Sequence, residues 1–170
     1  KGSALSATMR KGRRLAVDVG KARVGLAISD QDGILASPFA TVARLESLED
    51  TARGIQVVTD DYFFTEIYVG YPLSLSGKPT PSTDDAVALA SALTKVFDVD
   101  VRLIDERLTT VTASANLRLA GKNAKNSKSI IDQEAAAIIL ESALAGERAT
   151  EAAPGKLLAE YLAETEGDNE

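Results

Sequence analysis

The sequence contains no cysteine and no histidine. Cysteine thiolates and histidine nitrogens are the usual ligands of structural zinc, and histidine is the base of Ser-His-Asp triads. These absences exclude thiol catalysis, structural zinc sites and imidazole bases. Catalysis by this chain must therefore use carboxylates, hydroxyls, Lys, Arg, or a metal ion held by oxygen ligands.

Long apolar runs are also missing. No stretch of 18 apolar residues occurs, so we expect no membrane span and no membrane partner. The first thirteen residues are small and basic and lack the apolar centre of a secretory signal, so we expect a cytoplasmic protein. Residues 1–12 read as a disordered tail or an addition to the natural chain. With 170 residues, 45% of them hydrophobic, the remainder is long enough for one domain with its own core.

Acidic residues outnumber basic ones by six, but they are unevenly distributed. The last 24 residues hold seven acids and two bases, and we assign residues 149–170 to an acidic C-terminal helix or tail. Two segments are basic: residues 10–14, and residues 107–131, which contain no acid. Such segments can bind a phosphate backbone, although an ordinary solvated face explains them equally well.

The order of apolar patterns predicts an alternating α/β domain. Short apolar runs predict strands at residues 15–19, 24–28, 34–42, 66–70 and 99–104, and Pro38 indicates an edge strand or a bulge. Helical spacing predicts helices at residues 47–58, 82–97, 109–121 and 129–145, with Ser47 and Ser82 as N-terminal caps.

Three acidic residues occupy unusual positions. Asp18 interrupts an apolar strand, where a carboxylate needs a partner or a metal, although it could also cap the turn at Gly20. Glu106 follows directly after a core strand, where α/β proteins place functional groups, although residues 105–107 could form a surface ion-pair cluster. Asp132 begins a helix and shares a stripe with Ala136, Ile139 and Ala143, although capping-box spacing from Ser129 offers a structural role.

Four motifs follow one another in the sequence: Asp18-x-Gly-x-x-Arg-x-Gly, Val69-Gly-Tyr-Pro, Asp105-Glu-Arg-Leu-Thr-Thr and Lys128-Ser-Ile-Ile-Asp-x-x-Ala-Ala-x-Ile-x-Leu. In this order the set resembles the YqgF (RuvX) family, bacterial RNase H-like proteins described as pre-16S rRNA nucleases or Holliday junction resolvases. Each motif alone is weak, whereas the ordered set, from about residue 13 to residue 145, is specific.

The resemblance implies a ribonuclease H-like α/β fold: a five-stranded mixed sheet, three strands antiparallel and the rest parallel, flanked by helices on both faces. It also implies a nuclease domain at residues 13–148, in which Asp18, Glu106 and Asp132 are the catalytic, metal-binding carboxylates. Resolvases of this fold usually carry an acid after the fourth strand, where this chain has Gly70-Tyr-Pro. Glu106 would serve instead, with Asp105 in reserve.

The chemistry of three converging carboxylates agrees with that assignment. Two carboxylates about 4 Å apart repel by roughly 4 kcal/mol at an effective dielectric constant of 20, so the set requires a counter-charge. Mg²⁺ or Mn²⁺ supplies it, because hard cations bind oxygen ligands and a pair of ions can activate water and stabilise the leaving oxygen of a phosphodiester.

Basic residues at matched or neighbouring positions gain roles as substrate ligands. We expect Arg23, beside Asp18, to hold a phosphate while Gly20 and Gly25 permit close approach. Arg107 would contact phosphate or anchor Glu106. The remaining candidates are Lys122, Lys125 and Lys128.

The predicted function is metal-dependent endonucleolytic cleavage of structured RNA, at the 5′ end of the pre-16S rRNA, or of branched DNA such as a Holliday junction. An ATPase of the actin and sugar-kinase type would need two such domains, and this chain holds one. A non-catalytic nucleic-acid-binding module stays open. Junction cleavage requires two symmetric sites and hence a dimer, and we expect a monomer or a weak homodimer.

Overall fold

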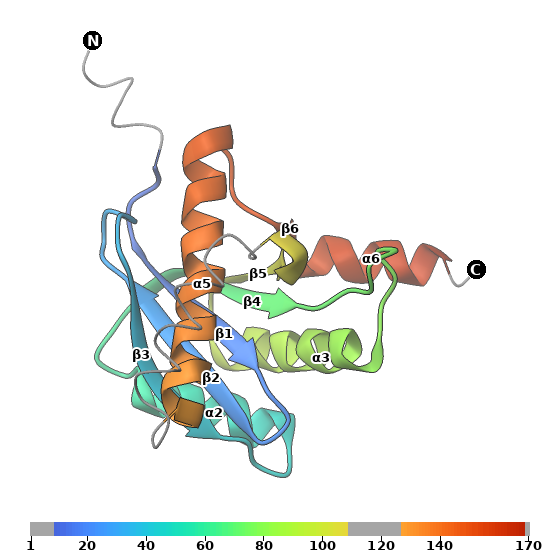
Figure 1. Ribbon diagram of the computed structural model, residues 1–170, viewed down its shortest axis with the longest axis horizontal. Coiled ribbons are helices and arrows are strands. Elements are labelled where there is room, and N and C mark those ends of the chain that lie inside the picture. Colours follow the sequence, from blue (N-terminus) through green and yellow to red (C-terminus); the bar gives the residue numbers. More distant parts are fainter. Residues whose placement is uncertain (1–8, 109–126, 169–170) are drawn as a thin grey trace.

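The protein is described by a computed structural model, which covers residues 9–108 and 127–168. A mixed sheet has the strand order β3-β2-β1-β4-β5-β6 and carries helices on both faces (Figure 1). β1, β2 and β3 are antiparallel, β1, β4 and β5 are parallel, and β6 is antiparallel to β5. The strands are β1 (Arg13–Val19), β2 (Arg23–Ser29), β3 (Ala36–Ala43), β4 (Phe64–Tyr71), β5 (Asp100–Asp105) and β6 (Lys156–Leu157).

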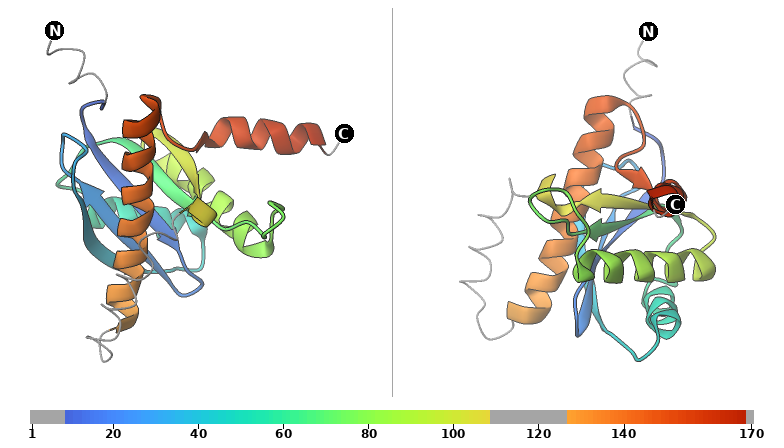
Figure 2. Two further views of the ribbon diagram at one scale, coloured as in Figure 1. Left: turned by 45° about the horizontal axis from the view of Figure 1, so that its top comes forward. Right: turned by 90° about the vertical axis from the view of Figure 1, so that its right-hand side faces the viewer.

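Helices α2 (Leu48–Val58) and α3 (Pro81–Val96) cover one face of the sheet, and α5 (Ser127–Thr150) crosses the other (Figure 2). Helix α6 (Leu158–Asp168) follows β6. None of the helices in the described ranges is long and apolar enough to cross a bilayer. The helix predicted at residues 109–121 lies outside the described residues.

The predicted ribonuclease H-like α/β architecture is confirmed, but the predicted number of five strands is wrong. The sixth strand, β6, has two residues and pairs with Arg102 and Leu103 of β5. A pair this short has no apolar periodicity by which the sequence could reveal it. Gly155 permits the contact: its φ is +65°, and a Cβ there would lie 2.2 Å from the Leu103 carbonyl oxygen.

The predictions for the ends and edges of the elements are confirmed at Ser47 and Pro38 and wrong at Ser82. Ser47 caps α2 as predicted, and its side chain accepts a hydrogen bond from the Asp50 amide. Pro38 lies on edge strand β3, at the bulge opposite Ala27, also as predicted. The cap predicted at Ser82 is wrong, because Thr80 caps α3 in a capping box with Thr83 and Pro81 occupies the first turn.

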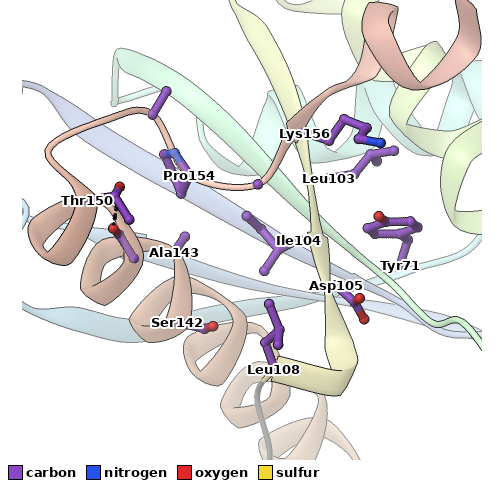
Figure 3. A pocket seen from close by; sticks show the side chains of 13 residues that line it. Tyr71, Leu103, Ile104, Asp105, Leu108, Ser142, Ala143, Thr150, Pro154 and Lys156 are labelled. Atoms are coloured by element: carbon purple, nitrogen blue, oxygen red, sulfur yellow. Dashed lines mark hydrogen bonds between the residues drawn. The ribbon is translucent and has the colours of Figure 1, made fainter. Parts of the chain in front are cut away.

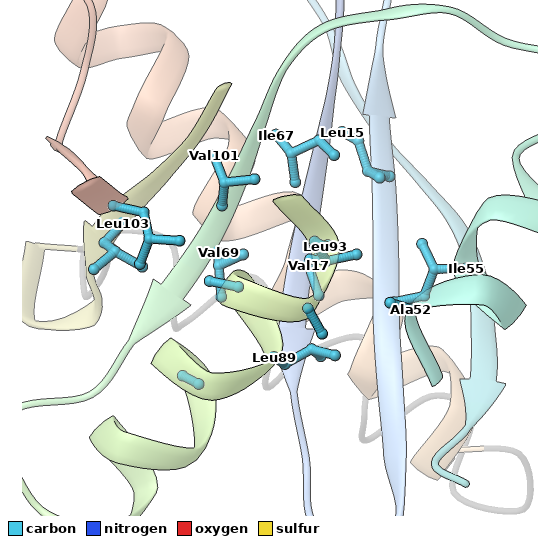
Figure 4. Packing of buried hydrophobic residues seen from close by; sticks show 14 of the residues in the cluster. Leu15, Val17, Ala52, Ile55, Ile67, Val69, Leu89, Leu93, Val101 and Leu103 are labelled. Carbon is cyan, nitrogen blue, oxygen red and sulfur yellow. The ribbon is translucent and has the colours of Figure 1, made fainter. Parts of the chain in front are cut away.

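The sheet separates two hydrophobic cores. Because successive side chains of a strand point to opposite faces, Leu15 and Val17 of β1 pack toward α2 and α3, in the core drawn in Figure 4. Ala16 lies in the second core, beneath Ala136 and Leu140 of α5. The same alternation directs Asp18, two residues after Ala16, to the face that α5 covers.

Ion pairs occupy the opposite end of β1. Arg14 is fully buried, with its Nη2 3.2 Å from Glu147 Oε2. Arg10 bridges Glu147 and the buried Glu66, at 2.7 Å from each. These two arginines therefore neutralise buried acids. The possibility that residues 10–14 bind phosphate is wrong for Arg10 and Arg14. The predicted division of the chain near residues 12 and 148 stays a prediction.

Candidate active site

Asp18 lies near the end of β1, beside a tightly closed hairpin turn. The Gly20 amide donates to the Arg23 carbonyl at 2.9 Å, and Arg44 donates to the Gly20 carbonyl at 3.0 Å while it pairs with Asp85. The turn is thus closed without a cap from Asp18, so the structural alternative for this carboxylate is unnecessary. In the ladder, Asp18 pairs with Gly25 of β2.

Glu106 follows the last residue of β5, and its carboxylate reaches sideways over β4. A Cβ added to Gly70 would lie 3.0 Å from Glu106 Oε2 and 2.5 Å from Ile139 Cδ1 of α5. Gly70 is the next-to-last residue of β4 and begins the Gly70-Tyr-Pro segment. The missing side chain leaves room for the Glu106 carboxylate, a role for Gly70 that sequence reasoning missed.

Asp132 reaches the sheet because α5 approaches β2 at a glycine. A Cβ on Gly25 would lie 1.9 Å from the Asp132 carbonyl oxygen, so any side chain there would push the helix away. Two further bonds fix this end of α5: Thr41 of β3 donates to the Ser129 carbonyl at 2.9 Å, and Gln133 donates to Thr41. Asp132 is therefore placed above the cross-strand pair of Asp18 and Gly25.

Electrostatics show that the three predicted carboxylates lie close together. Burial raises the pKa of Asp18 to about 7, and the charges of Glu106 and Asp132 contribute to the rise. The pKa of Glu106 is also raised, by burial and by the charge of Asp105. A buried acid whose pKa is raised further by two neighbouring acids marks a site that favours a counter-cation.

The donor set fits a hard divalent cation. Carboxylate oxygens are the ligands that Mg²⁺ prefers, and Mg²⁺ is commonly bound through one or two carboxylates and substrate phosphate. Among residues 9–108 and 127–168, no three acidic side chains are already arranged as ligands of one ion. Asp132 instead accepts a 2.7 Å hydrogen bond from Arg23 Nε.

Asp105, the reserve candidate, is engaged elsewhere. Arg107 donates from its main chain to Asp105 Oδ1 at 2.9 Å and from Nη2 to Oδ2 at 2.6 Å, and this pairing holds the pKa of Asp105 below its usual range. Figure 3 shows Ile104 pointing toward Ala143 of α5 across a hollow of about 380 Å³, whereas Asp105 lies on the Tyr71 side of β5. Asp105 and Arg107 thus form a separate pair at the edge of the site.

The predicted basic ligands are placed unevenly. Arg23 and Arg107 each expose 39% of their side chain, and both are paired with an Asp. Lys128 is exposed in the first turn of α5, four residues before Asp132. Lys122 and Lys125 lie outside the described residues.

Comparison with known proteins finds a matching family model and similar sequences. The family model described as RuvX, Holliday junction resolvase, matches residues 12–146. A protein of Leifsonia xyli subsp. xyli (strain CTCB07) is 52% identical over 147 residues, which are 86% of this chain and 94% of that protein. One of Streptomyces avermitilis is 47% identical over 149 residues, 87% and 95% of the two chains. The names of both describe them as candidate pre-16S rRNA nucleases.

Two solved structures have a fold similar to that of this chain. The RuvC of Thermus thermophilus, solved in complex with a Holliday junction substrate, matches with a TM-score of 0.56 and covers 84% of this chain and 98% of its own. A second structure of that RuvC gives a TM-score of 0.53. With 15% and 14% sequence identity, these matches concern the architecture alone.

Proposed function

The chain belongs to the RuvX family, and we propose that it is a metal-dependent endonuclease in which Asp18, Glu106 and Asp132 hold the metal. One observation carries this proposal: carboxylates from β1, the end of β5 and α5 lie on one face of the sheet, where burial, and then the charges of Glu106 and Asp132, raise the pKa of Asp18 to about 7. Asp132 is paired with Arg23, but the charges of both Glu106 and Asp132 act on the buried Asp18, and ion pairing alone would not require these acids to lie close together.

We assign each residue of the site a role. Asp18, whose pKa is raised by burial to about 7, would hold the cation in its ionised form. On the sheet face that α5 covers, Glu106 lies toward β4 and Asp132 lies toward β2, with Asp18 of β1 between them. A bound divalent cation, Mg²⁺ or Mn²⁺, would lower the pKa of an attacking water and stabilise charge on the phosphodiester. Arg23, Arg107 and the candidate lysines 122, 125 and 128 would orient the nucleic-acid backbone.

We propose structured RNA at the 5′ end of the pre-16S rRNA as the substrate, in the cytoplasm. The two curated relatives described above support this choice, since each covers more than four-fifths of the chain. A Holliday junction is the second candidate, supported by the description of the family model. The two substrates differ in a geometric demand, because symmetric junction cleavage needs two active sites.

A side-by-side cleavage assay tests the proposal. Labelled precursor rRNA and a four-way DNA junction are incubated with the protein, with Mg²⁺, with Mn²⁺ and with EDTA. We expect cleavage of the RNA that requires metal and is abolished by Asp18→Asn. The matched control Asp60→Asn, at an exposed site, should cleave like the parent.

The other outcomes separate the alternatives. Cleavage of the junction alone, by a protein that sediments as a dimer, would favour the resolvase. Binding of either substrate without cleavage in any metal would indicate a non-catalytic module. Equal cleavage by the parent and by Asp18→Asn would contradict the assignment of the site.

A further inference from the structure

Arg23 forms the ion pair that connects the hairpin turn with the carboxylate cluster. Its Nε lies 2.7 Å from Asp132 Oδ2, and the two side chains expose 39% and 18% of their surface. Arg23 is thus a basic residue in direct contact with one of the three acids. It therefore occupies Oδ2, one of the two Asp132 oxygens that a metal ion could use as a ligand.

The main chains on both sides of this pair are fixed. The hydrogen bond from the Gly20 amide to the Arg23 carbonyl closes the turn, and Gly25 is in direct contact with the Asp132 carbonyl. A change in the pair must consequently come from rotation of the two side chains. Arg23 is exposed enough to turn outward, whereas Asp132, less exposed, stays near Asp18.

Two cations cannot both lie against the Asp132 carboxylate without repulsion. Arg23 neutralises one acid of the cluster, while a divalent ion would neutralise two. A guanidinium released from Asp132 is also well suited to phosphate, because its planar set of donors matches two phosphate oxygens.

We propose that Arg23 is an exchangeable counter-ion: a divalent metal displaces it from Asp132, and the released guanidinium then binds the phosphate of the substrate. This inference rests on the proposed metal site and adds a coupling that the site alone does not require. Metal binding makes Arg23 available to nucleic acid, and nucleic acid, by holding Arg23 away, favours metal. Thermodynamic linkage requires the two effects to be equal.

The first test measures Mn²⁺ affinity without nucleic acid, by titration monitored through the electron paramagnetic resonance signal of free Mn²⁺. Half-exposed ion pairs are weak, so removing the competing cation in Arg23→Gln should tighten Mn²⁺ binding by roughly fivefold. Lys128→Gln removes one exposed positive charge near Asp132 without breaking a described ion pair and should change the affinity less than twofold.

Either of two results would overturn the exchange. Weaker Mn²⁺ binding by Arg23→Gln would mean that Arg23 positions Asp132 as a ligand. An equal gain in both variants would reduce the effect to general charge. Arg23→Lys, which keeps the charge but lacks Nε, should fall between the parent and Arg23→Gln.

The second test follows the ion pair directly. The Nε–H resonance of Arg23, assigned by its loss in Arg23→Gln, is recorded by ¹⁵N NMR during a Mg²⁺ titration at constant ionic strength. We expect it to move toward the position of a solvated guanidinium, with the same midpoint as Mg²⁺ binding. A resonance unchanged at saturating Mg²⁺ would refute the displacement.

The third test measures coupling. RNA affinity is determined with EDTA and with Ca²⁺, under conditions in which gels show the RNA intact. Ca²⁺ should increase the affinity of the parent several-fold more than that of Arg23→Gln; an equal increase would contradict the release of Arg23 to phosphate. Since none of the three tests uses cleavage, a protein that passes them and cuts nothing would refute the proposed nuclease function and leave the exchange intact.

Discussion

Asp18→Asn should stabilise the metal-free protein at neutral and alkaline pH. The pKa of Asp18 is about 7 in the folded protein, against an ordinary value of 3.8. Between these two values the folded state binds the proton more tightly than the unfolded chain does. The stabilising contribution of protonated Asp18 is therefore fully present below about pH 4 and is lost as the pH rises to 7. At about 1.36 kcal/mol for each unit of pKa, the free energy of unfolding falls by about 4 kcal/mol.

The Asn variant has no proton to lose, so its stability relative to the parent should increase by up to about 4 kcal/mol between pH 4 and pH 8. Urea denaturation in EDTA at half-unit steps of pH measures this difference. In a protein of this size the change corresponds to a melting temperature higher by roughly 8 to 16 °C at pH 8. Asp60→Asn, which removes an exposed carboxylate, provides the baseline for the loss of one charge.

A divalent metal should reduce this difference. Mg²⁺ at 100 times its dissociation constant would stabilise the parent by about 2.7 kcal/mol and should leave Asp18→Asn nearly unaffected. A stability difference that stays constant across the pH range would show that burial and the neighbouring acids do not raise the pKa of Asp18, and the carboxylate cluster would lose its main support.

Three further predictions concern the packing of α5 on β2, the buried ion pair of Arg14 and Glu147, and the binding of nucleic acid. Gly25→Ala should destabilise the protein by roughly 1–3 kcal/mol in urea denaturation and weaken Mn²⁺ binding, because its Cβ would collide with the Asp132 carbonyl; tolerance of the change would contradict the close approach of α5. Glu147→Gln should cost roughly 3–5 kcal/mol in the same assay, because it leaves the buried Arg14 with a neutral partner, while cleavage by the folded fraction stays at the parent rate. If the five candidate basic residues contact phosphates, the plot of log affinity against log salt should have a slope of about −3.5 to −4.5, and an affinity insensitive to salt would remove them from the interface.

The pattern of apolar residues was sufficient to predict most of the sheet and helices. Five strands and the helices α2, α3 and α5 lie within a few residues of their predicted ranges, because the strands are short apolar runs and the helices carry apolar residues at a period of 3.6. The position of Asp132 on the stripe of Ala136, Ile139 and Ala143 followed from the same period, and these three residues are buried. Strand β6 was missed because two residues carry no period.

Contacts between distant segments were harder to predict. The sequence indicated that Arg23 and Asp132 both serve the site, but not that they pair with each other, because 109 residues separate them. For residues 10–14 the sequence left phosphate binding and a solvated face equally open, and neither alternative included the internal ion pairs of Arg10 and Arg14, whose acids come from β4 and from the far end of α5. A cluster of charge in the sequence does not reveal whether its partners lie in solvent or in the protein.

Glycines at two sheet positions link the packing of α5 to the chemistry of the site. Gly25 admits the main chain of Asp132, and Gly70 admits both Ile139 and the Glu106 carboxylate, so the same absent side chains that let the helix approach also let the acids converge. Asp18 and Glu106 belong to the sheet, whereas Asp132 belongs to the helix. The distance between them is consequently set by helix packing, and any substitution that lifts α5 from β2 should weaken metal binding before it unfolds the sheet. Thr41, which holds this end of α5 from β3, is therefore as important to the geometry of the site as the residues that would contact the metal.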